Sequence, residues 1–223
     1  MSDAAIAICN LSIDRIAGDA IESFTEETPL GAFCARNFPD LQRDLLSKYR
    51  WTFANQIARL AEVAPDPAEA APMAHRFARP GDLTGAVHAW RDHADPAQGR
   101  RVHVLDVGRH FWADTRVVFA EYTRMVAPEH WPSWFKTLFQ TALAARLADF
   151  AQQRTLANRL TSEAFGTPQD NGEGGLYQQA RNEDARLAPP RQLTTGVDAG
   201  PLVGVRERHG FAYDPSWVVI GGA

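Results

Sequence analysis

Histidine is the residue type that could most readily do chemistry in this chain, because imidazole binds metal ions and exchanges protons near neutral pH. His88 and His103 fall in two neighbouring β-prone segments, and Asp92 or Asp106 could supply a carboxylate. Two histidines and one carboxylate would suit a small metal-dependent hydrolase. The spacings, however, match neither H-E-x-x-H nor a zinc finger. Histidines in ordinary strands are therefore the favoured interpretation.

The other motifs that usually carry catalysis are missing from the sequence. It contains no G-x-S-x-G, and "NGEGG" (171–175) lacks the Lys-Ser/Thr and the preceding strand of a phosphate-binding loop. We therefore predict that the protein is not an enzyme, that it has no catalytic residues or metal ligands, and that it needs no cofactor.

Charge gives little support for nucleic-acid binding by the whole protein. The formal net charge is −4 and the pI is near 6.0, whereas a phosphate backbone attracts basic surfaces. One stretch is locally basic: in the predicted helix 136–160, Lys136, Arg146, Arg154 and Arg159 are opposed by Asp149 alone. A DNA-binding module built on this helix is one alternative, and an ordinary solvated face is the more common one.

The chain has two cysteines, Cys9 and Cys34, and neither belongs to a C-x-x-C motif. With no secretory signal pattern at the start, we expect two buried thiols in a reducing compartment. No apolar run approaches the ~20 residues that cross a bilayer, so no membrane partner is expected.

Spacings of three and four between apolar residues predict most of the secondary structure. They indicate helices at 3–18, at 30–48 with a kink or restart at Pro39, from Pro132 to Ala151 followed by a break or bend near Gln153 and Arg154, at 156–166 and at 176–188. The helix that begins after Pro132 has the most regular apolar pattern, with alanines on its flanks. We expect it to be central and enclosed.

Between about 80 and 125 the apolar period falls to two. "LTGAVHAW" (83–90), "RRVHVLDV" (100–107) and "TRVVFAEYT" (115–123) predict a three-stranded antiparallel meander with one face packed on helices. "GRHFWAD" (108–114) is interpreted as a turn whose aromatics serve packing. From Pro189 onward, Gly and Pro are frequent and no helical period remains.

The stretch "YRWTFANQIARLA" (49–61) poses the sharpest question in the sequence. Trp51 and Phe53 precede small apolar residues at helical spacing, and they could form a ligand platform or anchor a helix over 49–64. The small apolar neighbours favour anchors in a helix–helix contact. The predicted fold is therefore α+β and mainly α: a helical bundle over 1–188 with a small antiparallel β-meander insertion, followed by an extended C-terminal tail, 189–223.

Five stretches, in this order, resemble the head-to-tail adaptor (connector) proteins of tailed bacteriophages, the family that includes the podovirus tail tubular protein A. They are "IAICNLSIDRIAGDAIESFTEETPLGAFCARNF", "LLSKYRWTFANQIARLA" with its Trp51-x-Phe53-Ala54, "RPGDLTGAVHAW", "EYTRMVAPEHWPSWFKTLFQTALAARLA" and "YQQARNEDAR". The third stretch departs from the family pattern, with Arg79 in place of Leu and Gly81 after Pro80. Together the stretches extend over roughly residues 4–188.

This resemblance implies a structural protein of a phage or phage-like gene transfer particle, made in the host cytoplasm and located at the head–tail junction. It implies a homo-oligomeric ring, twelvefold in this family, beneath the portal protein. Such a ring extends the DNA channel without sequence-specific binding, helps to retain the packaged genome, and docks stopper or tail proteins.

The C-terminal tail is the predicted portal-binding segment. A β-prone apolar run such as "WVVI" (217–220) has to be covered, either by its own domain or by another subunit. In this family, C-terminal segments often reach toward the portal. The proposed contacts are Arg191, Leu202, Val203, Phe211, Tyr213, Trp217, Val218, Val219 and Ile220.

Overall fold

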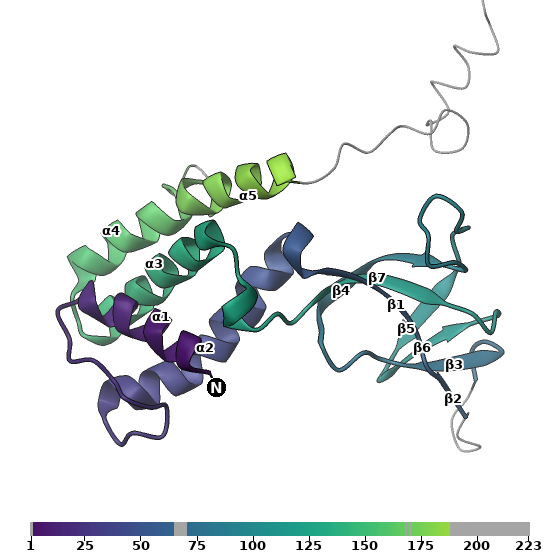
Figure 1. Ribbon diagram of the computed structural model, residues 1–223, viewed down its shortest axis with the longest axis horizontal. Helices are drawn as coiled ribbons and strands as arrows, with labels where there is room; N and C mark the ends of the chain where they lie inside the picture. The colour runs from purple at the N-terminus through teal and green to yellow at the C-terminus, as the bar shows by residue number, and fades with distance from the viewer. Residues whose placement is uncertain (1, 65–70, 168, 170, 188–223) are drawn as a thin grey trace, which may run out of the picture. The chain divides into compact units, whose positions relative to one another are not determined.

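A computed structural model describes residues 2–64, 71–167, 169 and 171–187 (Figure 1). Within these ranges helix accounts for 46% of the residues and strand for 20%, which makes the fold α+β. The predicted docking tail, 189–223, lies outside the described residues. No helix in the described part is long and apolar enough to cross a bilayer.

Helices form where apolar spacing predicted them. They are α1 (Asp3–Asp14), α2 (Pro29–Lys48), α3 (Ser133–Phe150), α4 (Arg154–Phe165) and α5 (Gly175–Leu187). The Thr28 side chain caps α2 by accepting a hydrogen bond from the backbone N–H of Gly31. Because α2 continues through Pro39, that proline does not restart the helix. The predicted break near Gln153 is confirmed, since α3 and α4 are separate helices.

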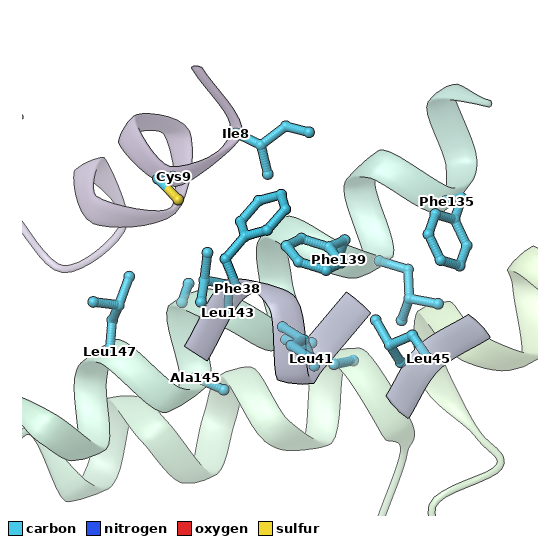
Figure 2. Packing of buried hydrophobic residues seen from close by; sticks show 14 of the residues in the cluster. Ile8, Cys9, Phe38, Leu41, Leu45, Phe135, Phe139, Leu143, Ala145 and Leu147 are labelled. Atoms are coloured by element: carbon cyan, nitrogen blue, oxygen red, sulfur yellow. The ribbon is translucent and has the colours of Figure 1, made fainter. Parts of the chain in front are cut away.

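Helix α3 is central, as expected. It contacts α1, α2, α4 and α5 (Figure 1). Figure 2 shows Phe38 and Leu41 of α2 packed with Phe139 and Leu143 of α3. Alanines on α3 bring the neighbouring helices close, and four of them are buried: Ala142, Ala144, Ala145 and Ala148.

The predicted helix over 49–64 is wrong. Tyr49 is extended, a single 3₁₀ turn, η1, spans Thr52–Ala54, and strands β1 (Asn55–Arg59) and β2 (Glu62–Val63) follow. β1 pairs antiparallel with β7 (Phe119–Arg124) along its whole length. Alanine, glutamine and arginine favour helix locally. Pairing with β7, whose residues lie 60 to 68 positions further along the chain, overrides this weak preference.

The predicted meander is also wrong, although its outer strands pair. β4 (Leu83–Arg91) and β1 flank β7 in one sheet, while the other sheet has the order β2, β3 (His75–Ala78), β6 (His110–Ala113), β5 (Val104–Val107). The difference arises at "GRHFWAD", which supplies strand β6 instead of a turn. Gly108, at φ +63°, begins a two-residue hairpin turn that folds β6 back onto β5.

The two sheets bury their apolar faces against each other, not mainly against helices as expected. Their shared core contains residues from strands of both sheets and two residues beside strand ends, Leu60 and Val118; the strand residues are Phe77, Phe111, Ala113, Ala120 and Tyr122. The aromatics of "GRHFWAD" do serve packing, because Phe111 and Trp112 are buried. The strands therefore form a unit with its own core, joined to the helices through α2 and β4.

Candidate functional site

Trp51 lies where the chain leaves α2 and enters the sheets. Its side chain is 0% exposed, and its indole N–H donates a hydrogen bond of 2.8 Å to the backbone oxygen of Leu45. Ala54 is also buried, and Phe53 packs against the same core. A ligand platform needs an accessible aromatic face, so these residues are structural anchors, although they anchor a 3₁₀ turn and not a long helix.

Aromatic rings from three separate parts of the sequence enclose Trp51. Ring centroids lie 4.9 Å away at Tyr49, 5.2 Å at Phe135 and 6.0 Å at Tyr177, all with edge-to-face geometry. Trp134 adds a tilted contact at 5.5 Å. This aromatic cluster joins the end of α2 to α3 and α5.

A buried carboxylate of α5, Asp184, binds the chain next to Trp51, at the junction where α2 leads into the sheets. Asp184 accepts hydrogen bonds from the backbone N–H of Thr52 at 2.9 Å and from the Thr52 hydroxyl at 2.9 Å. Thr52 begins the 3₁₀ turn η1, whose first N–H groups have no partner within the turn itself. Asp184 therefore caps η1 from a residue 132 positions away, and sequence spacing alone gives no sign of this contact.

Asp184 makes stability depend on pH in a direction that can be measured. Burial raises the pKa of its carboxyl, and the hydrogen bonds from Thr52 offset only part of that rise. The folded chain then holds this proton more tightly than the unfolded chain, so stability falls as pH rises from about 4 through the raised pKa. Asp184→Asn removes this titration. We expect the free energy of unfolding of the parent to fall relative to that of Asp184→Asn between about pH 4 and pH 7. Urea unfolding of both proteins at the two pH values measures this difference.

Glu183→Gln is the matched control for that measurement, because it removes the same charge from an exposed neighbour on α5. An effect of net charge alone would appear in both variants. A relative stability of Asp184→Asn that stayed constant, or fell with rising pH, would contradict the interpretation.

A partly buried ion pair lies where the chain enters the sheets, next to Trp51. Glu121 of β7 is 4% exposed and pairs with Arg50, and Asn55 donates a further hydrogen bond of 3.1 Å to the same carboxylate oxygen. Sequence analysis did not select these residues. The available signal was Glu121 itself, a single carboxylate inside the apolar strand "VVFAEY", since such a group is rarely buried without a partner.

The structure gives no support for a metal site at His88 and His103. His88 Nε2 hydrogen-bonds the Thr123 hydroxyl at 2.9 Å, and burial, followed by the charge of Arg50, lowers its pKa. His103 is exposed and precedes β5 in the other sheet. Within the described ranges, no three His, Cys, Asp or Glu side chains are grouped to hold a metal ion.

The basic stretch 136–160 does not form one continuous helical face. Most of α3 is buried among the other helices, so it cannot enter a DNA groove as a recognition helix. Arg146 lies 3.6 Å from Asp44 of α2, and Arg154 and Arg159 belong to the separate helix α4. The stretch 136–160 therefore spans two helices, not the single helix on which the DNA-binding alternative was based.

Among the open grooves of the described helical part, two are lined by residues of α3. One, of about 360 Å³, runs between α3 and α5 and is lined by Trp134, Thr137, Leu176, Gln179, Ala180, Asn182 and Glu183. The other, of about 300 Å³, runs between α3 and α4 and includes Ala142, Arg146, Asp149 and Phe165. Their mixture of small, apolar and polar linings suits contact with a protein surface better than an enclosed small-molecule site.

The residues predicted to bind the portal, from Arg191 to Ile220, lie outside the described residues. No known protein-family model matches the sequence, and no match is found among curated proteins. Neither comparison assigns a family or a function.

Proposed function

We propose that this protein is a structural head-to-tail adaptor of a phage or phage-like particle. It forms a ring under the portal protein, extends the DNA channel, and docks stopper or tail proteins. In this proposal the helices form a bundle that carries the β-strands as an insertion, and the C-terminal tail binds the portal. The proposal includes no catalytic step.

One observation carries the proposal: the stretches that resemble the adaptor family meet one another in space. Trp51 of the second stretch packs on Phe135 of the fourth and Tyr177 of the fifth. Asp184 of the fifth stretch caps the turn that begins at Thr52 of the second. Residues that share a resemblance and also contact each other are expected when the resemblance reflects a common architecture.

The first stretch has an internal contact of the same kind. The Asn10 side chain donates to the backbone oxygen of Ile21 at 3.0 Å and accepts from its N–H at 2.9 Å. These hydrogen bonds join the Cys9-Asn10 part of the stretch to its Ile21-x-Ser23-Phe24 part. The motif residues thus fix how the chain turns after α1, which supports a role in architecture.

A ring suits a chain with modest surface grooves. A heterologous contact that closes by rotation makes a ring, and each subunit then needs only one patch and its complement. Docking segments repeated around such a ring gain avidity, so each can bind its portal subunit weakly.

Electron microscopy of the assembled particle tests the proposed function most directly. Density for α1–α5 and the two sheets should occur as a closed ring between portal and tail. Density for this chain at any other position, or no density in the particle, would overturn the proposal.

The tail hypothesis predicts a specific loss. Deleting residues 210–223 removes Trp217, Val218, Val219 and Ile220, and we expect portal capture in a pull-down to fall by at least about tenfold, because these apolar anchors are lost from every subunit of the ring. Native mass spectrometry of the truncated chain should still show its ring, since the described core is unchanged. Undiminished portal capture would mean that the tail is not the portal-binding segment.

A further inference from the structure

Three arginines and one aromatic ring form a line across the sheet of β1, β7 and β4 (Figure 1). Phe119 of β7 lies directly opposite Arg59 of β1 on one side and Arg91 of β4 on the other. Arg91 pairs in turn with Arg101 through an isolated antiparallel bridge. Directly opposed residues of antiparallel segments point to the same face, and their backbones lie about 4.8 Å apart. We call these four side chains the Arg–Phe row.

The Arg–Phe row faces away from the core that the two sheets share. Each of its three strand residues has a chain neighbour in that core or packed against it: Ala58, Ala120 and Trp90. Successive side chains of a strand point to opposite faces of the sheet. Arg59, Phe119 and Arg91 therefore lie on the outer face, and Arg101 joins them there through its pairing with Arg91.

The outer face becomes accessible toward the row. Thr123 and Glu121, on the same face of β7, are only 1% and 4% exposed. Phe119, further along the strand, is half-buried, while Arg59 and Arg101 are exposed. In the described part of the chain, no second aromatic ring packs on the Phe119 ring and no cation lies over it. The accessible part of this ring is therefore open to a ligand.

The positive charge of the row is not neutralised by a neighbouring carboxylate. Arg79 of the same β-rich part has Asp106 as its partner. In contrast, the three arginines of the row form no ion pair with any described residue. Arg91 Nη1 donates a hydrogen bond of 3.3 Å to the backbone oxygen of Pro96, which positions the guanidinium and leaves its charge unpaired. A line of uncompensated cations suits a polyanion.

We propose that the Arg–Phe row is a binding site for single-stranded nucleic acid. The guanidinium groups bind backbone phosphates, and one base stacks on Phe119. An acidic protein surface matches the charges but supplies no flat ring to stack on Phe119. A duplex keeps its bases stacked on one another, so it also leaves this ring unused. The inference goes beyond the adaptor function and does not depend on it.

Fluorescence anisotropy of the full-length chain with a labelled oligothymidine of about eight nucleotides tests the proposal. The logarithm of the binding constant should fall with the logarithm of salt concentration, with a slope of about −2 between about 50 and 200 mM NaCl. This slope follows from three phosphate contacts, each contributing about −0.7 on a single strand. An unlabelled duplex of about twelve base pairs should compete at least about tenfold more weakly.

Two variants separate the charge from the stacking. Arg59→Gln with Arg101→Gln removes two phosphate contacts, so affinity at about 50 mM NaCl should fall at least about tenfold and the slope should shrink to about −0.7. Phe119→Leu keeps every charge, so the slope should stay near −2 while affinity falls at least about fivefold. Circular dichroism checks that each variant is folded, and if Phe119→Leu is not, the arginine variant still decides the matter.

Arg43→Gln with Arg186→Gln is the matched control, because it removes the same charge from two exposed arginines outside the row. Its affinity and salt slope should equal those of the parent. An equal loss in this control would overturn the proposal, since it would show that net charge alone governs binding. No binding of the oligothymidine at about 50 mM NaCl would also overturn it and would favour an acidic protein surface as the partner. Duplex that competes as well as the single strand would exclude stacking on Phe119.

Discussion

Replacing Trp51 with alanine is expected to lower the free energy of unfolding by about 3–5 kcal/mol, one of the two largest effects of a single substitution predicted for this chain. The indole is fully buried, so its removal leaves a cavity among the surrounding aromatic rings. The backbone oxygen of Leu45 also loses the hydrogen bond that Trp51 donates. Urea unfolding followed by circular dichroism measures the loss.

Two further substitutions test whether the stability lost in Trp51→Ala comes from the aromatic cluster around Trp51. Leu11→Ala removes an apolar side chain that is 53% exposed, and it should change stability by less than about 0.5 kcal/mol. Trp51→Phe keeps a ring in the aromatic cluster and should cost less than Trp51→Ala. If Trp51→Ala unfolds at the same urea concentration as the parent, Trp51 is not a core anchor.

Local pattern predicted the helices well, because each of them buries a face that repeats every three or four residues. The apolar spacing of Phe135, Leu138, Phe139 and Ala142 placed α3 correctly and indicated that it is enclosed. The break between α3 and α4 was also predictable, since the apolar pattern loses its phase near Gln153.

The strands were harder to predict because their partners are distant in sequence. "NQIAR" is short, and its apolar residues fit a helix or a strand equally well. Its pairing with β7 decides the outcome, and nothing within the segment reports that partner. The same difficulty hid β6, whose aromatics were predicted to pack but not to form a strand.

The candidate site was predictable only in part, for the same reason. Burial of Trp51 followed from its small apolar neighbours. The carboxylates that fix its surroundings did not, because Asp184 and Glu121 find their partners 132 and 71 residues away. Polar contacts across such separations depend on the completed fold, and a lone carboxylate in an apolar segment is their main local sign.

Arg50→Met is the second large effect, with an expected loss of about 2–4 kcal/mol. Its partner Glu121 has a side chain only 5% exposed, so the carboxylate would stay buried with its principal counter-charge removed. Asn55 would still donate its hydrogen bond, but an amide cannot compensate a full charge. The side chain of Arg50 is 34% exposed, which places the expected loss below that of a fully buried pair. Urea unfolding at neutral pH measures the difference.

The two partners should respond unequally, and a double-mutant cycle shows this. Glu121→Gln leaves Arg50 able to reach water and keeps an acceptor for Asn55, so its expected cost is about 1 kcal/mol. Combining Glu121→Gln with Arg50→Met should recover part of the stability that Arg50→Met loses, because a neutral amide is cheaper to bury than an unpaired carboxylate. A double variant less stable than Arg50→Met alone would show that the loss comes from the packing of the Arg50 side chain and not from a buried, unpaired carboxylate.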